Sequence, residues 1–338
     1  MIDKTILFRA DGNVQIGLGH LFRLFSLVEM LKSKYKFIFL TKADSTSSVI
    51  PEQYPLATIP LEFSTEEEIR WLSSRFESKN HILIADGYQF NTNYQKEVKS
   101  KGFSLVYIDD LGKERMFADI VINHSPGLKS QDYFSEPYTK FALGTEYAML
   151  RPKFIEAAKK IRAIRPIKEV FLCFGGSDPF NFTQRFAQLL LELNQIERIH
   201  IVLGGAYKHE SLKDLIKENE NRISSYSNLS ESSLLSVMKQ CDFGIAPAST
   251  ILYELCCVKM PILSGYYVDN QENIYNGFLN EGAICGVGDL KLRTDQELKK
   301  SITALLEMKD YSEFILSQSR LFDSNITNRI KDLVKELC

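Results

Sequence analysis

The sequence predicts an α/β protein built from two doubly wound domains, each a parallel sheet with helices on both faces. Short apolar runs recur along the chain and alternate with amphipathic stretches of helical period. The length of 338 residues corresponds to about two domains of roughly 150 residues each. A basic stretch near the middle of the chain, Arg151–Lys168, has the composition of a connector between them.

The composition excludes several classes of protein. Hydrophobic residues make up 44% of the chain, charged residues 25% and aromatic residues 11%, which is ordinary for globular proteins and unlike disordered chains. The formal net charge of −2 gives no overall attraction to nucleic acid, so we expect no nucleic-acid partner. No run approaches the ~18 apolar residues of a transmembrane helix, and the first residues do not resemble a signal peptide. We expect a cytoplasmic protein without an integral membrane segment, and we also expect a monomer.

Neither a metal nor another cofactor is expected. The cysteines lie among apolar neighbours and form no Cys-x-x-Cys pair, which is typical of small buried hydrophobes. The following histidines have no cysteine or carboxylate at metal-ligand spacing: His81, His124, His200 and His209.

The first half, positions 1–150, is predicted to form the N-terminal domain. Its apolar runs predict strands, and the amphipathic stretches between them predict helices. The predicted strands are Thr5–Ala10, Lys36–Thr41, Ile82–Asp86, Ser104–Ile108 and Ile120–Ile122. The predicted helices are His20–Ser33, Glu66–Glu77 and Asn93–Lys101.

The second half repeats the pattern after the connector. Positions 151–168 carry seven basic residues against one acid, which predicts an exposed segment. The C-terminal domain is predicted over 169–308, and positions 309–338 are expected to form helices that pack back across the domains. The predicted strands are Glu169–Phe174, Ile199–Leu203, Phe243–Ala246 and Pro261–Ser264. The predicted helices are Thr183–Leu193, Glu231–Gln240, Thr250–Val258, Asp295–Glu307, Tyr311–Arg320 and Ile326–Leu337.

The turn after the first strand, Asp11-Gly-Asn-Val-Gln-Ile-Gly-Leu-Gly-His20, leads into a helix. Its glycines allow a ligand to approach backbone N–H groups at the helix start. Phe22 occupies the third glycine position of Gly-x-Gly-x-x-Gly, which argues against a dinucleotide site. His20 can take a proton from water near neutral pH, or it only caps or packs. Arg23 either binds a phosphate or carboxylate, or forms a surface ion pair.

Three motifs of the second half also follow predicted strands. Gly175-Gly176-Ser177 can hold a diphosphate through backbone N–H groups and a hydroxyl, or it is an ordinary turn. Ser249 or Thr250 is expected to cap the next helix, with Glu254 one turn later within reach of ribose hydroxyls. Asp269-Asn270-Gln271 offers amide side chains to a sugar or a uracil edge.

Two further strand ends of the N-terminal half carry polar side chains. Tyr88, in Asp86-Gly-Tyr88, either bonds a substrate or is a half-buried loop residue. Asp109 and Asp110 are adjacent, so on a strand they face opposite ways and do not form an acid–base pair.

Together these motifs resemble the UDP-sugar hydrolases of pseudaminic acid biosynthesis, over roughly positions 5–290. Those enzymes share the GT-B fold, two Rossmann-like domains facing each other across a cleft, with the lipid II-forming N-acetylglucosaminyltransferase. The matching segments are Phe-Arg-x-Asp11, Ile-Gly-x-Gly-His20-x-x-Arg23, Asp86-Gly-Tyr88, Ile108-Asp-Asp, Gly-Gly-Ser-Asp178, Ser249 to Glu254, Asn270-Gln271 and the inter-domain stretch Gly-x-x-Tyr147-x-x-Leu-Arg151.

The resemblance implies a reaction and a role for each site residue. It implies hydrolysis of UDP-2,4-diacetamido-2,4,6-trideoxy-β-L-altropyranose, with inversion at the anomeric carbon and without a metal. His20 would position or deprotonate the attacking water. The residues implied for the sugar are Asp11, Gly19, Arg23, Tyr88, Asn270 and Gln271, and those implied for UDP are Gly175, Gly176, Ser177, Ser249, Thr250 and Glu254.

Two alternatives remain open. A UDP-sugar-dependent glycosyltransferase of the same fold would replace the water with an acceptor hydroxyl, and 151–168 is its candidate acceptor surface. A non-catalytic nucleotide-sugar-binding protein would have no need of His20. The sequence also departs from the resembling family at Gly87, where some members carry a bulkier residue, and in an extension from about Lys291.

Overall fold

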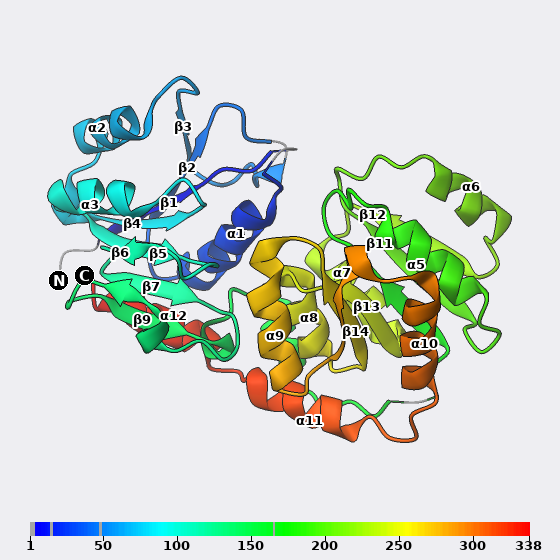
Figure 1. The fold of residues 1–338 in the computed structure, drawn as a ribbon. Helices are drawn as coiled ribbons and strands as arrows, with labels where there is room; N and C mark the ends of the chain where they lie inside the picture. The colour runs from blue at the N-terminus through cyan, green and yellow to red at the C-terminus, as the bar shows by residue number, and fades with distance from the viewer. Residues whose placement is uncertain (1–3, 14–15, 47–48, 165) are drawn as a thin grey trace. The chain divides into compact units, whose positions relative to one another are not determined.

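The structure is a computed structural model that describes residues 4–13, 16–46, 49–164 and 166–338. It divides the chain into two compact units (Figure 1). Unit 1 comprises Met1–Pro152 and Asn325–Cys338, and unit 2 comprises Lys153–Ser324. Positions 14 and 15 of the histidine loop, position 165 of the predicted connector and the first three residues lie outside the described residues.

The described part of unit 1 contains a seven-stranded parallel sheet in the order β3-β2-β1-β4-β5-β7-β9. Its strands are β1 Thr5–Ala10, β2 Phe37–Lys42, β3 Leu56–Ile59, β4 His81–Asp86, β5 Ser104–Ile108, β7 Ile120–Asn123 and β9 Lys140–Leu143, with a separate pair β6 Arg115–Met116 and β8 Phe134–Ser135. The chain adds β2 and β3 on one side of β1 and then returns to add β4 on the other side. The strand order therefore reverses between β1 and β4, which is where doubly wound sheets bind ligands.

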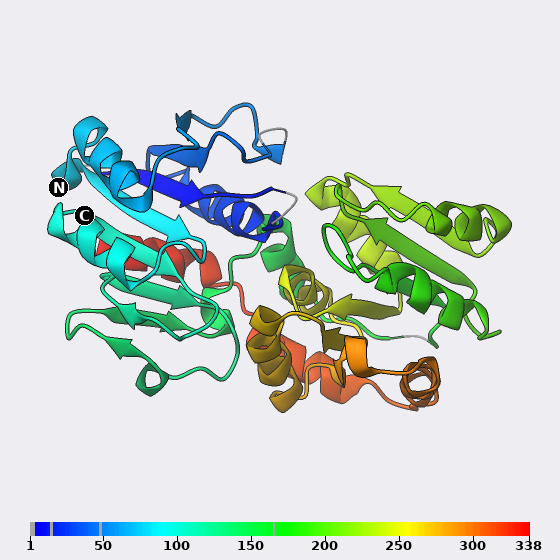
Figure 2. The same ribbon diagram turned by 45° about the horizontal axis from the view of Figure 1, so that its top comes forward.

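Helices cover both faces of this sheet (Figure 2). They are α1 Gly19–Leu31, α2 Thr65–Arg75, α3 Thr92–Ser100 and α12 Ile326–Lys335. Short 3-10 helices span Ser78–Asn80, Ser130–Asp132 and Thr145–Tyr147. α2 and α3 pack over one face, where Leu7 and Leu83 belong to a buried cluster, and α1 packs with α12 on the other. α2 begins with a capping box in which Ser64 and Glu67 bond each other's backbone N–H groups.

Unit 2 contains a six-stranded parallel sheet, counted over its described residues, in the order β12-β11-β10-β13-β14-β15. The strands are β10 Glu169–Leu172, β11 Arg198–Leu203, β12 Ile223–Ser227, β13 Phe243–Pro247, β14 Ile262–Tyr266 and β15 Cys285–Asp289. Here the strand order reverses between β10 and β13.

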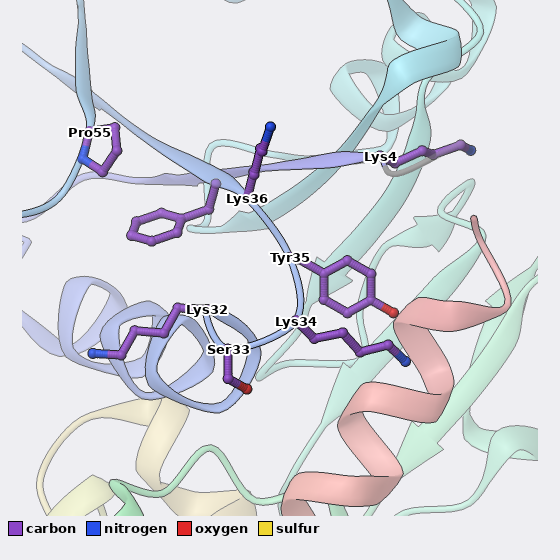
Figure 3. Close-up of a pocket in the computed structure, with 8 residues that line it drawn as sticks. Lys4, Lys32, Ser33, Lys34, Tyr35, Lys36 and Pro55 are labelled. Carbon is purple, nitrogen blue, oxygen red and sulfur yellow. The ribbon is translucent and has the colours of Figure 1, made fainter. Parts of the chain in front are cut away.

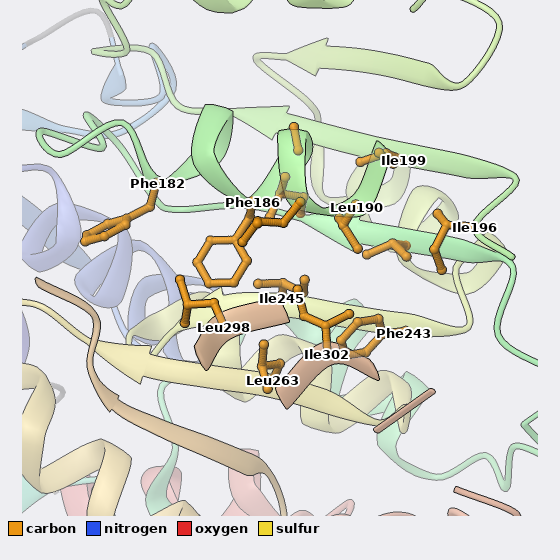
Figure 4. Close-up of a cluster of buried hydrophobic side chains, with 14 of the residues drawn as sticks. Phe182, Phe186, Leu190, Ile196, Ile199, Phe243, Ile245, Leu263, Leu298 and Ile302 are labelled. Atoms are coloured by element: carbon orange, nitrogen blue, oxygen red, sulfur yellow. The ribbon is translucent and has the colours of Figure 1, made fainter. Parts of the chain in front are cut away.

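The core of unit 2 lies between this sheet and its helices. Phe186 and Leu190 of α5 (Phe182–Leu191) point toward Ile245 of β13, and Leu298 and Ile302 of α10 (Asp295–Leu306) complete the cluster (Figure 4). Burying each such side chain stabilises the fold by about 1.5–3 kcal/mol. The helices are α4 Pro152–Ala158, α5 Phe182–Leu191, α6 Ser211–Glu218, α7 Glu231–Gln240, α8 Thr250–Val258, α9 Glu272–Asn280, α10 Asp295–Leu306 and α11 Ser312–Leu321, with 3-10 helices at Asp269–Gln271 and Leu290–Leu292.

Two parallel doubly wound sheets confirm the predicted fold class. Every predicted strand and helix is present within a few residues of its predicted bounds. Several elements were not predicted because their sequences carry weak signals. β12 reads Ile-Ser-Ser-Tyr-Ser and β15 contains two glycines, so neither forms an apolar run. The other unpredicted elements are β3, β6, β8, β9, α4, α6 and α9.

The prediction of an exposed connector over 151–168 is wrong for its first half. Phe154 and Ile155 of α4 are buried, so this helix is part of the packed structure. The ammonium of Lys259 donates to the carbonyls of Ala158 and Lys160 at 2.5 and 2.9 Å and closes the helix end. The count of basic residues missed the helix because its lysine, Lys153, is exposed while its apolar residues are buried.

The C-terminal segment divides between the units. α11 packs against α8 in unit 2, whereas α12 packs against α1 in unit 1. Ion pairing of Lys140 with Glu336 at 2.5 Å and a hydrogen bond from Lys4 to the carbonyl of Leu337 attach the last helix to unit 1. The chain therefore leaves unit 1 near residue 152 and returns to it at 325.

Candidate functional site

The switch point of unit 1 brings the histidine loop beside the end of β4. Ala10 at the end of β1 pairs with Asp86 at the end of β4. The loop then turns into α1, whose second residue is His20. A Cβ atom at Gly12 would lie 2.5 Å from Leu21, so a glycine at this position lets α1 start close to the strand end. Local sequence and strand order together place His20 against Asp86.

His20 and Asp86 form a buried hydrogen-bonded pair. Nδ1 of His20 lies 2.7 Å from Oδ1 of Asp86, and the two side chains are 9% and 0% exposed. A carboxylate oxygen only accepts, so we assign the ring proton to Nδ1. Nε2 then carries the lone pair, and no described residue forms a hydrogen bond with it. This arrangement, a base oriented by a carboxylate, suits general base catalysis.

Arg23 is clamped between two carboxylates. Its Nε donates to Asp86 Oδ2 at 2.9 Å and its Nη2 donates to Asp86 Oδ1 at 2.6 Å and to Asp110 Oδ2 at 2.9 Å. Nη1 also bonds Asp110, and the residue is 6% exposed. Neither the surface ion pair nor the predicted sugar contact fits this geometry, because four of its five N–H groups already point at carboxylates. Arg23 instead positions Asp86.

Tyr88 covers the ring of His20. The two rings meet edge to face with their centroids 4.9 Å apart, and the Tyr88 hydroxyl lies 3.3 Å from Asp110 Oδ2. Tyr88 is 46% exposed, so a ligand can reach it. This agrees with both readings of Tyr88, as a half-buried loop residue and as a substrate contact.

Asp11 is a structural residue of the loop. Its Oδ1 accepts from Arg9 and from the backbone N–H of Lys42, and its Oδ2 accepts from Gln89. Burial alone would raise the pKa of Asp11, but the Arg9 guanidinium and these hydrogen bonds outweigh it and lower that pKa. Asp11 is therefore held in an internal network, and its predicted contact with the sugar stays a prediction. Gly19 begins α1, is exposed and leaves open space where a side chain would be.

His124 is a second histidine near this cluster that the sequence did not single out. Burial and the Arg23 guanidinium lower its pKa to about 3, so it is neutral at physiological pH. Asp109 faces away from Arg23 and accepts from Tyr133 at 2.9 Å and from Asn123 at 3.1 Å. Asp109 and Asp110 thus have different partners, as the strand alternation predicted.

The glycine turn of unit 2 is built from two glycine pairs. Gly175, with a φ of 81°, follows β10, and Gly204 follows the neighbouring strand β11. A Cβ atom at Gly204 would lie 2.4 Å from the carbonyl oxygens of Gly175 and Gly176. The N–H of Ala206 donates to Gly176 at 3.0 Å. The second pair was missed, although Gly204-Gly205 after a predicted strand could have indicated it.

Gly176 and Ser177 are exposed on this turn, while Asp178 beside them is buried. The Asp178 carboxylate accepts from the N–H groups of Phe182 and Thr183 at 2.8 and 2.7 Å. It therefore satisfies the first turn of α5 with a negative charge that belongs to the chain itself. An anion at this turn would meet Gly176 and Ser177 rather than the start of α5.

Ser249, Thr250 and Glu254 follow β13, the strand next to β10 at the switch point. Ser249 is the N-cap residue of α8, but its side chain makes no capping hydrogen bond, which corrects the predicted cap. Glu254 is 3% exposed. Its charge adds to the effect of burial in raising the pKa of Cys173 to about 11, which places it near the strand end that leads into the glycine turn.

Gln271 is buried, and its Oε1 accepts from the backbone N–H of Tyr267 at 3.1 Å. Tyr267 in turn donates from its hydroxyl to the carbonyl of Phe174 at 3.3 Å. Gln271 therefore ties its loop to the segment after β10, and its predicted contact with the sugar stays a prediction. Asn270 is partly exposed beside it.

A separate cavity of about 550 Å³ lies at the other end of the unit 1 sheet (Figure 3). It is lined by Lys4, Lys32, Ser33, Lys34, Tyr35, Lys36, Phe37 and Pro55. The whole length of α1, ~1.5 Å per residue, separates it from His20. The lysine side chains point in different directions, so they form no common anion site. Among the described residues, no cluster of His, Cys, Asp and Glu could bind a metal ion, and no helix is long and apolar enough to span a membrane.

Known proteins resemble this chain in sequence. It is 28% identical over 282 residues to the UDP-2,4-diacetamido-2,4,6-trideoxy-beta-L-altropyranose hydrolase of Campylobacter jejuni, covering 82% of this chain and 97% of that protein. It is 27% identical over 283 residues to the uncharacterized protein MJ1062 of Methanocaldococcus jannaschii, covering 80% of this chain but 57% of that protein. The chain thus spans little more than half the length of the archaeal relative. No protein-family model matches the chain.

Solved structures resemble it in fold. MurG from Acinetobacter baumannii superimposes with a TM-score of 0.69 at 14% identity, covering 98% of this chain and 99% of that chain. The spinosyn rhamnosyltransferase SpnG, complexed with thymidine diphosphate, gives a TM-score of 0.67 at 13% identity, covering 99% of each chain. Both are GT-B glycosyltransferases. The chain therefore has the GT-B fold and is a remote relative of a UDP-sugar hydrolase.

Proposed function

We propose that the protein is a UDP-sugar hydrolase in which His20 deprotonates the water that attacks the anomeric carbon. The observation that carries the proposal is the 2.7 Å contact between His20 Nδ1 and Asp86 at the switch point of unit 1. It directs the lone pair of the ring to Nε2, the nitrogen without a described protein partner. A general base oriented by a carboxylate contributes about 10²–10⁴-fold to such a step.

Unit 2 supplies the nucleotide site in this proposal. The backbone N–H groups of the exposed residues Gly176 and Ser177 would bind the diphosphate, with Gly175 shaping the turn. Ser249 and Thr250 would bind UDP at the start of α8, and Glu254 would accept hydrogen bonds from the ribose. These elements follow adjacent strands, β10 and β13, at the switch point where nucleotides bind to doubly wound sheets. Backbone dipoles that stabilise the UDP leaving group leave only water activation to the base.

The substrate we propose is UDP-2,4-diacetamido-2,4,6-trideoxy-β-L-altropyranose, which places the reaction in pseudaminic acid biosynthesis. The support is the relative from Campylobacter jejuni, whose matched region covers nearly its whole length. Tyr88, Gly19 and Asn270 would contact the sugar. Direct attack by one water in a single displacement inverts the anomeric carbon.

The test is incubation of the purified full-length chain with this UDP-sugar and EDTA, without an acceptor. NMR should show UDP and the free sugar forming together, with the inverted anomer appearing first. Turnover that requires an added divalent metal, or retention of configuration, would refute the mechanism.

A glycosyltransferase is the second candidate, because the solved structures of this fold described above are glycosyltransferases. The same His20–Asp86 pair could deprotonate an acceptor hydroxyl instead of water. Tight UDP-sugar binding without release of free sugar, followed by transfer once an acceptor is supplied, would favour this candidate. Binding without either reaction would favour a nucleotide-sugar-binding protein.

A further inference from the structure

Arg23 joins two carboxylates that lie on different strand ends. One edge of its guanidinium, Nε and Nη2, bonds Asp86, and the other edge, Nη1 and Nη2, bonds Asp110. Asp86 Oδ1 is shared, because it also accepts from His20 Nδ1 at 2.7 Å. Arg23 Nη2 and His20 Nδ1 lie 3.0 Å apart only because both donate to this oxygen. His20 and Arg23 therefore compete for one carboxylate.

We propose that Asp110 is a positioning residue that acts through Arg23: it neutralises the guanidinium and so leaves the charge of Asp86 available to His20. With Asp110 ionised, one positive charge and two negative charges surround the imidazole, and one net negative charge remains. A proton taken up by His20 Nε2 then brings the buried cluster to neutrality. Without Asp110 the same proton would create an uncompensated positive charge in a buried site.

The surroundings of His20 agree with this charge balance. Burial alone would raise the pKa of Asp110, but the Arg23 guanidinium outweighs it and lowers that pKa, so Asp110 is ionised. His124 is neutral at physiological pH, and burial raises the pKa of Tyr107 far above its ordinary value. The described titratable groups that interact with His20 are Arg23 on α1, Asp86 at the end of β4, Tyr88 in the loop after β4 and Asp110 after β5. Tyr107 on β5 and His124 after β7 interact with Arg23, Asp86 and Asp110.

Asp110→Asn is the direct test, and the ring of His20 is the readout. Long-range ¹H–¹⁵N NMR of the full chain, with the His20 signal assigned from a His20→Gln variant, reports the tautomer and titration of the ring without any substrate. In Asp110→Asn we expect the midpoint of the His20 titration to fall by about one pH unit. We also expect the Nε2–H tautomer to become detectable as Arg23 takes over Asp86.

Asp109→Asn is the matched control. It changes the neighbouring carboxylate of the same loop, which bonds Tyr133 and Asn123 and not Arg23. It should leave the titration and tautomer of His20 unchanged. A shift of equal size in both variants would overturn the proposal, since the effect would then be a general disturbance of the loop.

The double variant Arg23→Gln with Asp110→Asn tests whether Asp110 acts on His20 through Arg23. It removes one positive and one negative charge, so the net charge around His20 returns to that of the unaltered chain. The titration midpoint should move back toward its original pH. A midpoint that stays where Asp110→Asn alone puts it would show that Asp110 does not act through Arg23. If Asp110→Asn fails to fold, the unaltered chain is compared with Asp110→Glu instead. This variant keeps the carboxylate charge, so the titration and tautomer of His20 should not change. A lower midpoint of the His20 titration in Asp110→Glu would count against the proposal.

The kinetic consequence rests on the proposed hydrolase function, whereas the NMR readout does not. If the chain hydrolyses the UDP-sugar, Asp110→Asn should lower kcat about 10- to 100-fold with KM within about twofold, and the acid limb of the kcat/KM profile should follow the NMR midpoint. Absence of hydrolysis in the unaltered chain would refute the function and leave the NMR test of Asp110 intact. Unchanged titration and tautomer in Asp110→Asn would refute the role of Asp110 whatever the activity.

Discussion

Gly204 packs so tightly on Gly176 that a Cβ atom at position 204 would lie 2.4 Å from the Cα atom of Gly176. Two strand-end turns of unit 2 therefore meet backbone to backbone, and no residue larger than glycine fits without moving one of them. The exposed residues whose N–H groups are proposed to bind the diphosphate, Gly176 and Ser177, lie on the turn that would move.

Gly204→Ala should displace the glycine turn and weaken UDP binding at least tenfold, together with about 1–3 kcal/mol of lost stability from the forced contact. Isothermal titration with UDP and chemical denaturation measure the two effects. Gly205→Ala is the matched control, because a Cβ atom there would lie 3.7 Å from Asn228, an ordinary contact. Equal UDP affinities of the two variants would contradict the proposed diphosphate site.

His20→Asn should lower kcat by about 10²–10⁴-fold and leave UDP affinity unchanged, since it removes the base but no UDP contact. Turnover of the UDP-sugar and titration with UDP are compared in the same preparation. Asp86→Asn, which keeps the shape but loses the carboxylate charge, should reduce kcat in the same direction. A parallel loss of UDP affinity in His20→Asn would count against the role of His20 as base.

The sequence identified His20 but could not identify its partner. Asp86 lies 66 residues away, and only the order of the strands, with β4 returning to the side of β1, brings the two together. Spacing contains no information on that order, so Asp86 was considered only as the neighbour of Tyr88. Asp11 and Gln271 were assigned to the sugar for the opposite reason. Their motifs are real, but their side chains already have partners inside the protein, and such partners cannot be seen in a motif.

Glu254→Gln should weaken UDP binding by about 1–3 kcal/mol, the cost of losing a charged acceptor for the ribose. Its buried position one turn into α8 makes the amide a close steric match, so the fold should persist. Titration with UDP and with inorganic pyrophosphate separates the contribution of the ribose to binding from that of the diphosphate. Pyrophosphate affinity should not change, and unchanged UDP affinity would refute the ribose contact.

Asp11 should give the fold a pH-dependent contribution. Its pKa in the folded state lies below the ordinary value of 3.8, so the ionised form stabilises the protein above that pH, and the contribution is lost as pH falls through the folded-state pKa. Asp11→Asn should therefore lower the free energy of unfolding by about 2 kcal/mol at pH 7. The difference from the unaltered chain should shrink below pH 3.8. Urea denaturation at pH 7 and at a pH below 3.8 measures the difference in free energy of unfolding between the two chains. A difference that does not change with pH would exclude the contribution of Asp11 ionisation.

Lys259 should prove to be the C-terminal cap of α4. Its ammonium is buried and donates to the carbonyls of Ala158, the last residue of α4, and of Lys160, just beyond the helix. A cation at that end satisfies both carbonyls and the helix dipole, so Lys259→Met should cost about 2 kcal/mol of stability. Because the released segment carries exposed basic residues, trypsin should cleave near Lys160 faster in this variant. Lys239→Met, at an exposed lysine of α7, is the control and should change neither stability nor cleavage. Stability equal to that of the unaltered chain would mean that the ammonium does not hold α4, and the helix would then depend on the burial of Phe154 and Ile155 alone.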